Sequence, residues 1–240
     1  MIEINDLTVR FGGVTPLDHM TITFGEGTNG LIGPNGAGKT TFFNVLSGFV
    51  RPAEGSVTAF GEDLLAMAHF RRARWGVRRT FQTEQAIEEL SVYDNVAMVH
   101  ENSSQDRIAA RREAVLSAIE FVGLKAKPQT KVGTLGAGER RLVELARAVV
   151  GQPRVILLDE PAAGLPDEES VRTSQVIQKI PDELGALVIL VDHDMSLVSA
   201  CCSKTAVLDF GKLIASGNTQ DVLRNDEVKK AYLGIEAVAV

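Results

Sequence analysis

The stretch that decides the fold is GPNGAGKTT at residues 33–41. It matches in full the phosphate-binding loop pattern G-x-x-x-x-G-K-[ST]. A short apolar run precedes the loop at residues 31–32. The apolar positions after the loop share one face of a predicted helix: Phe42, Val45, Leu46 and Phe49. A strand, a glycine-rich loop and a helix in this order predict a site for the phosphates of a nucleotide.

Each residue type in this loop is suited to holding phosphate oxygens. Gly36 and Gly38 allow the backbone to curl so that N–H groups point inward, and the start of the helix adds its positive dipole. Lys39 supplies a full charge for the β- and γ-phosphates, and the Thr40 hydroxyl can ligate Mg²⁺. The predicted nucleotide-binding residues here are Gly33, Pro34, Asn35, Gly36, Ala37, Gly38, Lys39, Thr40 and Thr41.

Composition is that of an ordinary globular protein of 240 residues, with 45% hydrophobic and 23% charged residues. A net charge of −6 disfavours a general nucleic-acid binder. No apolar run approaches the roughly 18 residues of a membrane helix, and the N-terminus lacks the pattern of a signal peptide. We therefore expect a cytoplasmic protein with no nucleic acid partner. The adjacent Cys201 and Cys202 favour simple packing, with redox sensing as the alternative.

Apolar patterning predicts an α/β core with a parallel sheet. The unbroken runs at 155–158 and 187–191 are typical of parallel strands covered on both faces. Alternation at 21–24 indicates antiparallel strands near the N-terminus, and 205–214 suggests a closing hairpin. The middle, roughly 84–150, has few strand signals and a helical period.

The predicted organisation is one domain over 1–240. Its core comes from 1–83 and 151–240, and a helical subdomain is inserted at about 84–150. Within this subdomain, four apolar residues can share a helix face: Ile108, Val115, Ile119 and Val122.

Two carboxylates end the run VILLDE at 155–160. Ligands of open α/β sheets bind at the carboxyl ends of strands, so we expect both carboxylates beside the phosphate loop. Asp159 is suited to holding Mg²⁺, and Glu160 to polarising an attacking water. Without the phosphate loop, a solvated turn would be the better explanation of this pair of carboxylates.

Gln82 and His193 are predicted to complete the site. Gln82, in RRTFQ, leaves the first half of the core and would join the nucleotide site to the helical segment. His193 directly follows the run at 187–191 and could reach a γ-phosphate and hold water in line. Taken alone, each would be an ordinary loop residue.

A second glycine-rich helix start, LGAGE, lies at 135–139. Exposed N–H groups at such a start bind anions, which makes candidates of Gly136, Ala137, Gly138 and Glu139. One nucleotide seldom needs two such elements from one chain. A dimer in which each chain offers this element to its partner's nucleotide explains the duplication.

In order along the chain, these motifs resemble those of the ATP-binding cassette (ABC) ATPases, the engines of ABC transporters. GPNGAGKT is similar to the family's Walker A motif, VILLDE to Walker B and LGAGE to the signature motif. By this resemblance Gln82 is the Q-loop glutamine, His193 the switch histidine and Phe11 the aromatic that stacks on adenine. It implies a P-loop NTPase fold: a RecA-like core with a parallel sheet, an antiparallel β subdomain and an inserted helical subdomain.

The resemblance also implies hydrolysis of ATP with Mg²⁺, coupled to transport. The implied catalytic residues are Lys39, Gln82, Glu160 and His193, and the implied metal-holding residues are Thr40, Gln82 and Asp159. The implied partners are a second ATPase subunit, identical or different, integral membrane permease subunits and, indirectly, a solute-binding protein. The implied location is the cytoplasmic face of the inner membrane, as a peripheral protein.

Smaller features resemble one subfamily. RFGG, RRTFQ, LLDEPAAGL, VDHDM and KKAYLG are similar to the ATPases of branched-chain amino acid importers, and to those of urea and short-amide importers. Five arginines cluster before Gln82: Arg71, Arg72, Arg74, Arg78 and Arg79. They could touch a permease or anionic lipid, but a solvated basic face is favoured.

The signature-like segment departs from the usual LSGGQ. Gly136 stands for Ser, Ala137 for Gly and Glu139 for Gln, and Pro166 replaces an Asp or Asn in a later loop. Losing a charge-assisted hydrogen bond to phosphate costs about 1.5–3 kcal/mol. We therefore hypothesise an asymmetric heterodimer with one competent and one degenerate site.

Three alternatives differ in class. A soluble ABC ATPase of DNA repair or ribosomes would call for long coiled-coil insertions or tandem cassettes, which this sequence lacks. A regulatory module that holds ATP without efficient turnover stays open. A small-molecule kinase fits poorly because no acceptor-substrate domain is evident.

Overall fold

Parallel strands form the central sheet of the computed structural model, which describes residues 1–103 and 108–233. The strand order is β10-β9-β3-β8-β7-β6. The bounds are β3 Thr28–Ile32, β6 Val77–Arg79, β7 Val155–Asp159, β8 Leu187–Val191, β9 Lys204–Asp209 and β10 Lys212–Asn218. Neighbours run parallel except β9 and β10, which form an antiparallel hairpin. The predicted parallel runs and closing hairpin are confirmed.

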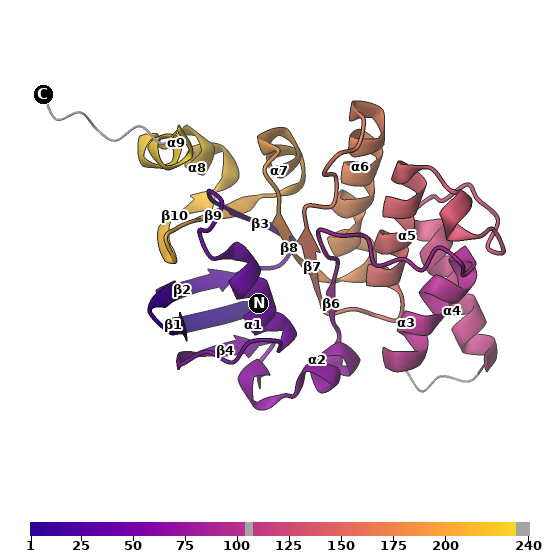
Figure 1. Cartoon of the computed structure of the whole chain (residues 1–240), viewed down its shortest axis with the longest axis horizontal. Helices are drawn as coiled ribbons and strands as arrows, with labels where there is room; N and C mark the ends of the chain where they lie inside the picture. The colour runs from indigo at the N-terminus through magenta and orange to yellow at the C-terminus, as the bar shows by residue number, and fades with distance from the viewer. Residues whose placement is uncertain (104–107, 234–240) are drawn as a thin grey trace, which may run out of the picture.

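An antiparallel sheet with the order β2-β1-β4-β5 lies beside it (Figure 1). Its strands are β1 Ile2–Phe11, β2 Val14–Phe24, β4 Glu54–Ala59 and β5 Glu62–Asp63. Helix α1 (Lys39–Ser47) shares a hydrophobic cluster with this sheet and with the central sheet. The predicted α/β class, with a parallel sheet and a separate antiparallel one, is confirmed.

Successive residues of the central strands face opposite layers. Leu157 and Ile189 join the cluster with α1, whereas Ile156 and Val188 join a second cluster made largely by helices. The helices that contribute to this second cluster include α5 Ala137–Val149, α6 Asp167–Leu184 and α7 Met195–Cys201. Because side chains alternate along a strand, an unbroken apolar run fills both layers.

Helices α3 (Val92–Ser103), α4 (Ile108–Phe121) and α5 lie between β6 and β7 in the chain and contact one another at one end of the molecule (Figure 1). A bridge between Ser91 and Lys131 joins the chain before α3 to the chain after α4. The remaining elements are η1 Leu64–Ala66, α2 His69–Trp75, η2 Val132–Thr134, α8 Thr219–Arg224 and α9 Asp226–Leu233. The predicted domain limits also include 104–107 and 234–240, which lie outside the described residues, so the division into subdomains stays a prediction.

Two residues assigned to apolar helix faces are exposed instead. Helix α1 ends at Ser47 because Gly48 turns left-handed, with φ 83°, and its N–H bonds back to the helix. Phe49 therefore lies beyond the helix and is 61% exposed. Ile108 begins α4 and is also exposed, whereas Val115 and Ile119 are buried as predicted.

The expectation of a solvated basic face before Gln82 is wrong for part of the cluster. Arg72 and Arg78 are buried, and only 6% of the Arg79 side chain is exposed. Arg71 and Arg74 do reach solvent, beside the ring of Phe70. Burial of a guanidinium requires local partners, so this segment is part of the packed structure.

The two cysteines are free, and Cys202 is buried. Burial raises the pKa of the Cys201 thiol to about 11 and raises the pKa of Cys202 as well. Both features favour packing over redox sensing. In the described ranges, no helix combines the length and apolarity that crossing a bilayer requires.

Asp194 caps α7, and its removal gives a pH-dependent prediction. Its carboxylate accepts hydrogen bonds from the Ser196 side chain and from the N–H groups of Ser196 and Leu197, and the Ser196 side-chain bond is the main cause of a lowered pKa. Asp194→Ala should lower the free energy of unfolding by about 1 kcal/mol at neutral pH. Because folding lowers the pKa of Asp194, its carboxylate stabilises the folded state at pH values above the ordinary pKa of Asp. This contribution is lost as the pH falls through the pKa of Asp194 in the folded protein.

Urea unfolding of both proteins from neutral to acid pH measures this difference, which should shrink in acid. Asp182→Ala, at an exposed position in α6, is the control. A difference that stays constant over the whole pH range would show that the cap acts without its charge.

Candidate nucleotide-binding site

A cleft of about 550 Å³ opens where β7 and β8 end and α1 begins. It is lined by Pro16, Asn35, Gly36, Ala37, Gly38, Lys39, Thr40, Thr41, Gln82, Asp159, Glu160, Val191 and His193. The phosphate loop, Gln82, the carboxylates after β7 and His193 thus meet as the sequence predicts, because the carboxyl ends of parallel strands share one edge. Pro16 and Val191 were not predicted.

The phosphate loop depends on glycine at a position of close approach. Gly38 has φ 108°, and a Cβ there would lie 2.2 Å from the carbonyl oxygen of Pro16. Among the described residues, no side chain caps the N-terminus of α1. The N–H groups of its first turn are therefore available to an anion, whose charge the helix dipole favours.

Lys39 is held by the loop it belongs to. Its Nζ donates to the carbonyl oxygens of Gly33 at 2.6 Å and Pro34 at 3.0 Å, and the residue is 8% exposed. Burial lowers the pKa of Lys39, and the carboxylates of Glu160 and Asp159 oppose this shift. The ammonium is thus desolvated but bonded to neutral carbonyls, so a phosphate would give it an anionic partner.

Glu160 brings together the two polar residues predicted beside it. Nε2 of Gln82 donates to its Oε2 at 3.0 Å, and Nε2 of His193 lies 2.8 Å from its Oε1. The residue itself has a left-handed φ of 49°, and its N–H donates to the carbonyl of Val191. Strained backbone of this kind persists only where surrounding contacts enforce it and is common at functional sites.

Asp159 pairs with Arg79, a residue that sequence reasoning had placed on a solvated face. Nη2 of Arg79 lies 3.1 Å from Oδ2 of Asp159, and both side chains are over 90% buried. The N–H of Asp159 donates to Oγ1 of Thr80 at 3.1 Å. Burial raises the pKa of Asp159, and the hydrogen bond from Arg79 opposes the rise. No local pattern signalled this pairing, because the two residues lie 80 positions apart in the sequence.

The cleft offers donors that suit Mg²⁺. The hydroxyl of Thr40, the amide of Gln82 and the carboxylate of Asp159 all line it. Magnesium prefers oxygen ligands and often takes one or two carboxylates in phosphate sites. The residues present therefore fit this ion.

Other predicted residues lie apart from the cleft. Phe11 ends β1 and is 53% exposed, and the segment 136–139 begins α5; neither is among the residues that line it. Gly33 and Pro34 are not among its lining residues, but their carbonyl oxygens accept hydrogen bonds from Lys39, which lines it. Within a single chain, the signature-like segment 136–139 is therefore not part of the cleft that contains the phosphate loop.

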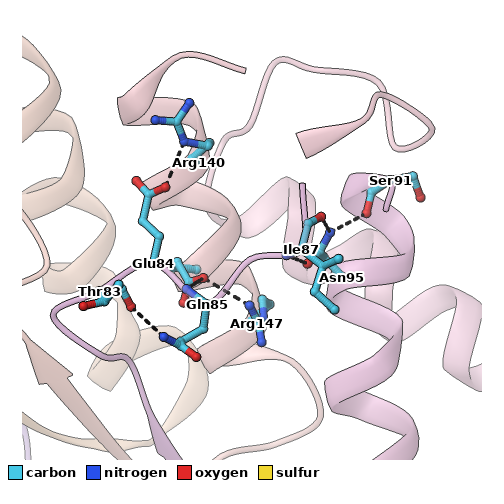
Figure 2. A network of polar contacts seen from close by, with 9 residues as sticks. Thr83, Glu84, Gln85, Ile87, Ser91, Asn95, Arg140 and Arg147 are labelled. Atoms are coloured by element: carbon cyan, nitrogen blue, oxygen red, sulfur yellow. Dashed lines mark hydrogen bonds and ion pairs between the residues drawn. The ribbon is translucent and has the colours of Figure 1, made fainter. Parts of the chain in front are cut away.

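Polar contacts tie the loop after the cleft, 83–91, to helix α5 (Figure 2). Nε of Arg140 lies 2.9 Å from Oε2 of Glu84. The N–H of Gln85 donates to the buried Glu144 at 2.9 Å. These contacts connect the segment that carries Gln82 to the helix that starts with the signature-like residues.

Comparisons with known proteins agree with this geometry. A family model described as "ABC transporter" matches residues 17–163. The chain is 34% identical to the high-affinity branched-chain amino acid transport ATP-binding protein BraF of Pseudomonas aeruginosa, over 98% of each chain. It is 34% identical to the methionine import ATP-binding protein MetN 1 of Burkholderia pseudomallei, over 98% of this chain and 70% of that protein.

A solved structure has the same fold. The ADP conformation of MJ1267, an ATP-binding cassette of an ABC transporter, superposes with a TM-score of 0.87 at 26% identity, covering 98% of this chain and 99% of that one. The range that the family model matches, 17–163, contains the phosphate loop, Gln82, Asp159 and Glu160. The chain therefore belongs to the ABC transporter family, as one of its ATP-binding, ATP-hydrolysing subunits.

Proposed function

We propose that this ATPase drives the import of branched-chain amino acids or closely related solutes. The observation that carries the proposal is the cleft, in which Lys39, Glu160 and His193 meet. The likeness to BraF over nearly the full length of both chains favours this solute class, because the MetN 1 protein extends well beyond the match.

The chain's own residues would bind and orient ATP. The loop N–H groups and Lys39 hold the phosphates, and Phe11 stacks on the adenine. Thr40, Gln82 and Asp159 would hold Mg²⁺, which neutralises phosphate charge when bound. Glu160, fixed between Gln82 and His193, orients or deprotonates the attacking water, and His193 also stabilises charge on the γ-phosphate.

The complete site needs a second ATPase subunit in head-to-tail arrangement. The segment 136–139 of one chain then faces the nucleotide held by the other, which accounts for its distance from its own cleft. The core at 1–83 and 151–240 would carry the nucleotide, and the helical subdomain at about 84–150 would carry the signature-like segment. With Gly136 in place of serine, the degenerate site would be the one this segment covers.

The remaining partners are integral membrane permease subunits and, through them, a solute-binding protein. The ATPase would lie at the cytoplasmic face of the inner membrane, where its ATP is available. Gln82 and the loop at 83–91 would transmit the closing motion to the permease. Contacts between this loop and α5 would couple the motion to the helix that begins with the signature-like segment.

Copurification followed by uptake tests this proposal. The tagged chain should bring down its permease subunits, and vesicles that hold the complex should take up leucine and valine when ATP is enclosed. Vesicles offered methionine or urea test the neighbouring solutes. Failure to bring down any membrane subunit, or uptake of methionine but of neither leucine nor urea, would overturn the assignment.

Gly136→Ser restores the missing hydroxyl and should raise the ATPase turnover of the isolated chain about tenfold or more, as one charge-assisted hydrogen bond predicts. The serine fits, because a Cβ at Gly136 meets no atom within 4 Å among the described residues. As N-cap of α5 it should change unfolding free energy by only a few tenths of a kcal/mol.

Steady-state hydrolysis by the chain alone and by its mixture with the second ATPase subunit measures this effect. Gly25→Ser, at another open position, is the matched control. Rapid hydrolysis by the unmodified chain alone would contradict the asymmetric arrangement.

A further inference from the structure

The Arg79 guanidinium lies between a carboxylate of the nucleotide cleft and a second groove. Arg79 contacts Asp159 at 3.1 Å through Nη2 and Oδ1 of Asn44 at 2.6 Å through Nη1. Its charge centre lies 4.8 Å from the centre of the Phe81 ring and 5.4 Å from that of Phe43. Hydrogen bonds on one side and aromatic faces on the other fix this side chain.

Arg79 also lines a groove of about 240 Å³. Phe81 lines the same groove, and its ring lies 6.5 Å from that of Phe49. Phe49 in turn lies 6.3 Å from His69 and is largely exposed. The groove is therefore walled by aromatic rings that reach solvent, with a buried cation behind them.

The same segment leads to the second carboxylate of the cleft. Gln82 directly follows Phe81 and donates to Glu160. A shift of the Phe81 ring would thus act on Asp159 through Arg79 and on Glu160 through Gln82. In the described ranges, the hydrogen bond to the Asp159 carboxylate comes from Arg79, so Arg79 fixes the direction of this carboxylate.

We propose that Arg79 is a positioning residue for Asp159 and makes the aim of that carboxylate depend on how Phe81 packs in the groove. The inference rests on the proposed function, because it concerns the metal-holding role of Asp159. Arg is suited to the task, since its planar fork bonds Asp159 and Asn44 together while its face stacks on Phe81. Removing one partner of a buried ion pair leaves the other without its orientation.

Arg78 provides a control within the same strand. It is buried as Arg79 is, but its Nη1 donates to the backbone carbonyls of Ala73 and Val77. Arg78 lines the same groove, but in the described ranges its hydrogen bonds go to these carbonyls and none joins it to Asp159, so it supports the fold without orienting that carboxylate. Variants of these two arginines therefore separate positioning from stability.

The test measures affinity for a fluorescent ATP analogue with and without Mg²⁺, on the full chain. Arg79→Met should reduce the Mg²⁺-dependent gain in affinity about tenfold or more, as displaced catalytic groups do, and leave Mg²⁺-free affinity unchanged. Arg79→Lys keeps the charge but loses the planar guanidinium that bonds Asp159 and Asn44, so it should give an intermediate Mg²⁺-dependent gain in affinity. This variant tests the positioning role if Arg79→Met does not fold. Phe81→Ala should lower the gain, and the double variant should lose no more than Arg79→Met alone.

Arg78→Met should lower the melting temperature and keep the full Mg²⁺-dependent gain. A wild-type gain in both Arg79 variants, or equal effects of Arg78→Met and Arg79→Met, would overturn the positioning role while leaving the proposed function intact. A wild-type chain that binds no ATP under either condition would overturn the proposed function and this inference with it.

Discussion

Glu160→Gln is expected to lower kcat for ATP hydrolysis by about 10²–10⁴-fold, the range that a lost general base produces. The amide keeps the size of the side chain and can still bond to Gln82 and His193, but it cannot accept a proton from water. ATP affinity should therefore stay close to that of the wild type. Phosphate release under saturating ATP measures kcat, and nucleotide titration measures affinity.

Glu168→Gln, an exposed position in the first turn of α6, is the matched control and should leave kcat unchanged. If Glu160→Gln hydrolyses ATP at the wild-type rate, the carboxylate has been given the wrong role. A loss of affinity equal to the loss of turnover would instead place Glu160 in ground-state binding.

Lys39→Met should weaken ATP binding about 100-fold, because charge-assisted bonds to phosphate contribute about 1.5–3 kcal/mol each. The unfolding temperature should not fall, since burial of the charged ammonium already lowers its pKa and a methionine of similar length needs no hydration. Isothermal titration with ATP and thermal unfolding of the same preparation measure the two effects.

Lys212→Met, an exposed lysine in β10 that pairs with Asp18, serves as the control for a lost charge. An Lys39→Met protein with unchanged ATP affinity would show that the phosphates bind elsewhere. A large drop in unfolding temperature would indicate that the bonds from Nζ to Gly33 and Pro34 support the fold as well.

Local pattern was sufficient where one segment determines its own structure. The phosphate loop, the buried runs that became β7 and β8, and the hairpin of β9 and β10 follow from glycine spacing and continuous apolar residues. The end of α1 was misjudged because the apolar period continues to Phe49, whereas the left-handed turn at Gly48 stops the helix.

Long-range partners were beyond the reach of local pattern. Glu160 meets Gln82 from 78 positions away, and Arg79 meets Asp159 from 80. The sequence placed Gln82 near the site through its position at the exit from the first half of the core and through its resemblance to a family motif. It did not predict that three of the five clustered arginines would be buried. Arg72 donates to the distant carbonyls of Val45 and Leu46, and Arg79 pairs with the distant Asp159, whereas Arg78 donates to the nearby carbonyls of Ala73 and Val77.

The bonds from Lys39 to the carbonyls of Gly33 and Pro34 have a thermodynamic consequence. They close the loop into a ring around its own ammonium, so the backbone has already lost its conformational entropy before a ligand arrives. Binding of ATP then requires Lys39 to exchange its carbonyl acceptors for phosphate oxygens, and the chain needs little further ordering. Calorimetry should accordingly record a small heat-capacity change for the encounter, well below that of a segment that folds on binding.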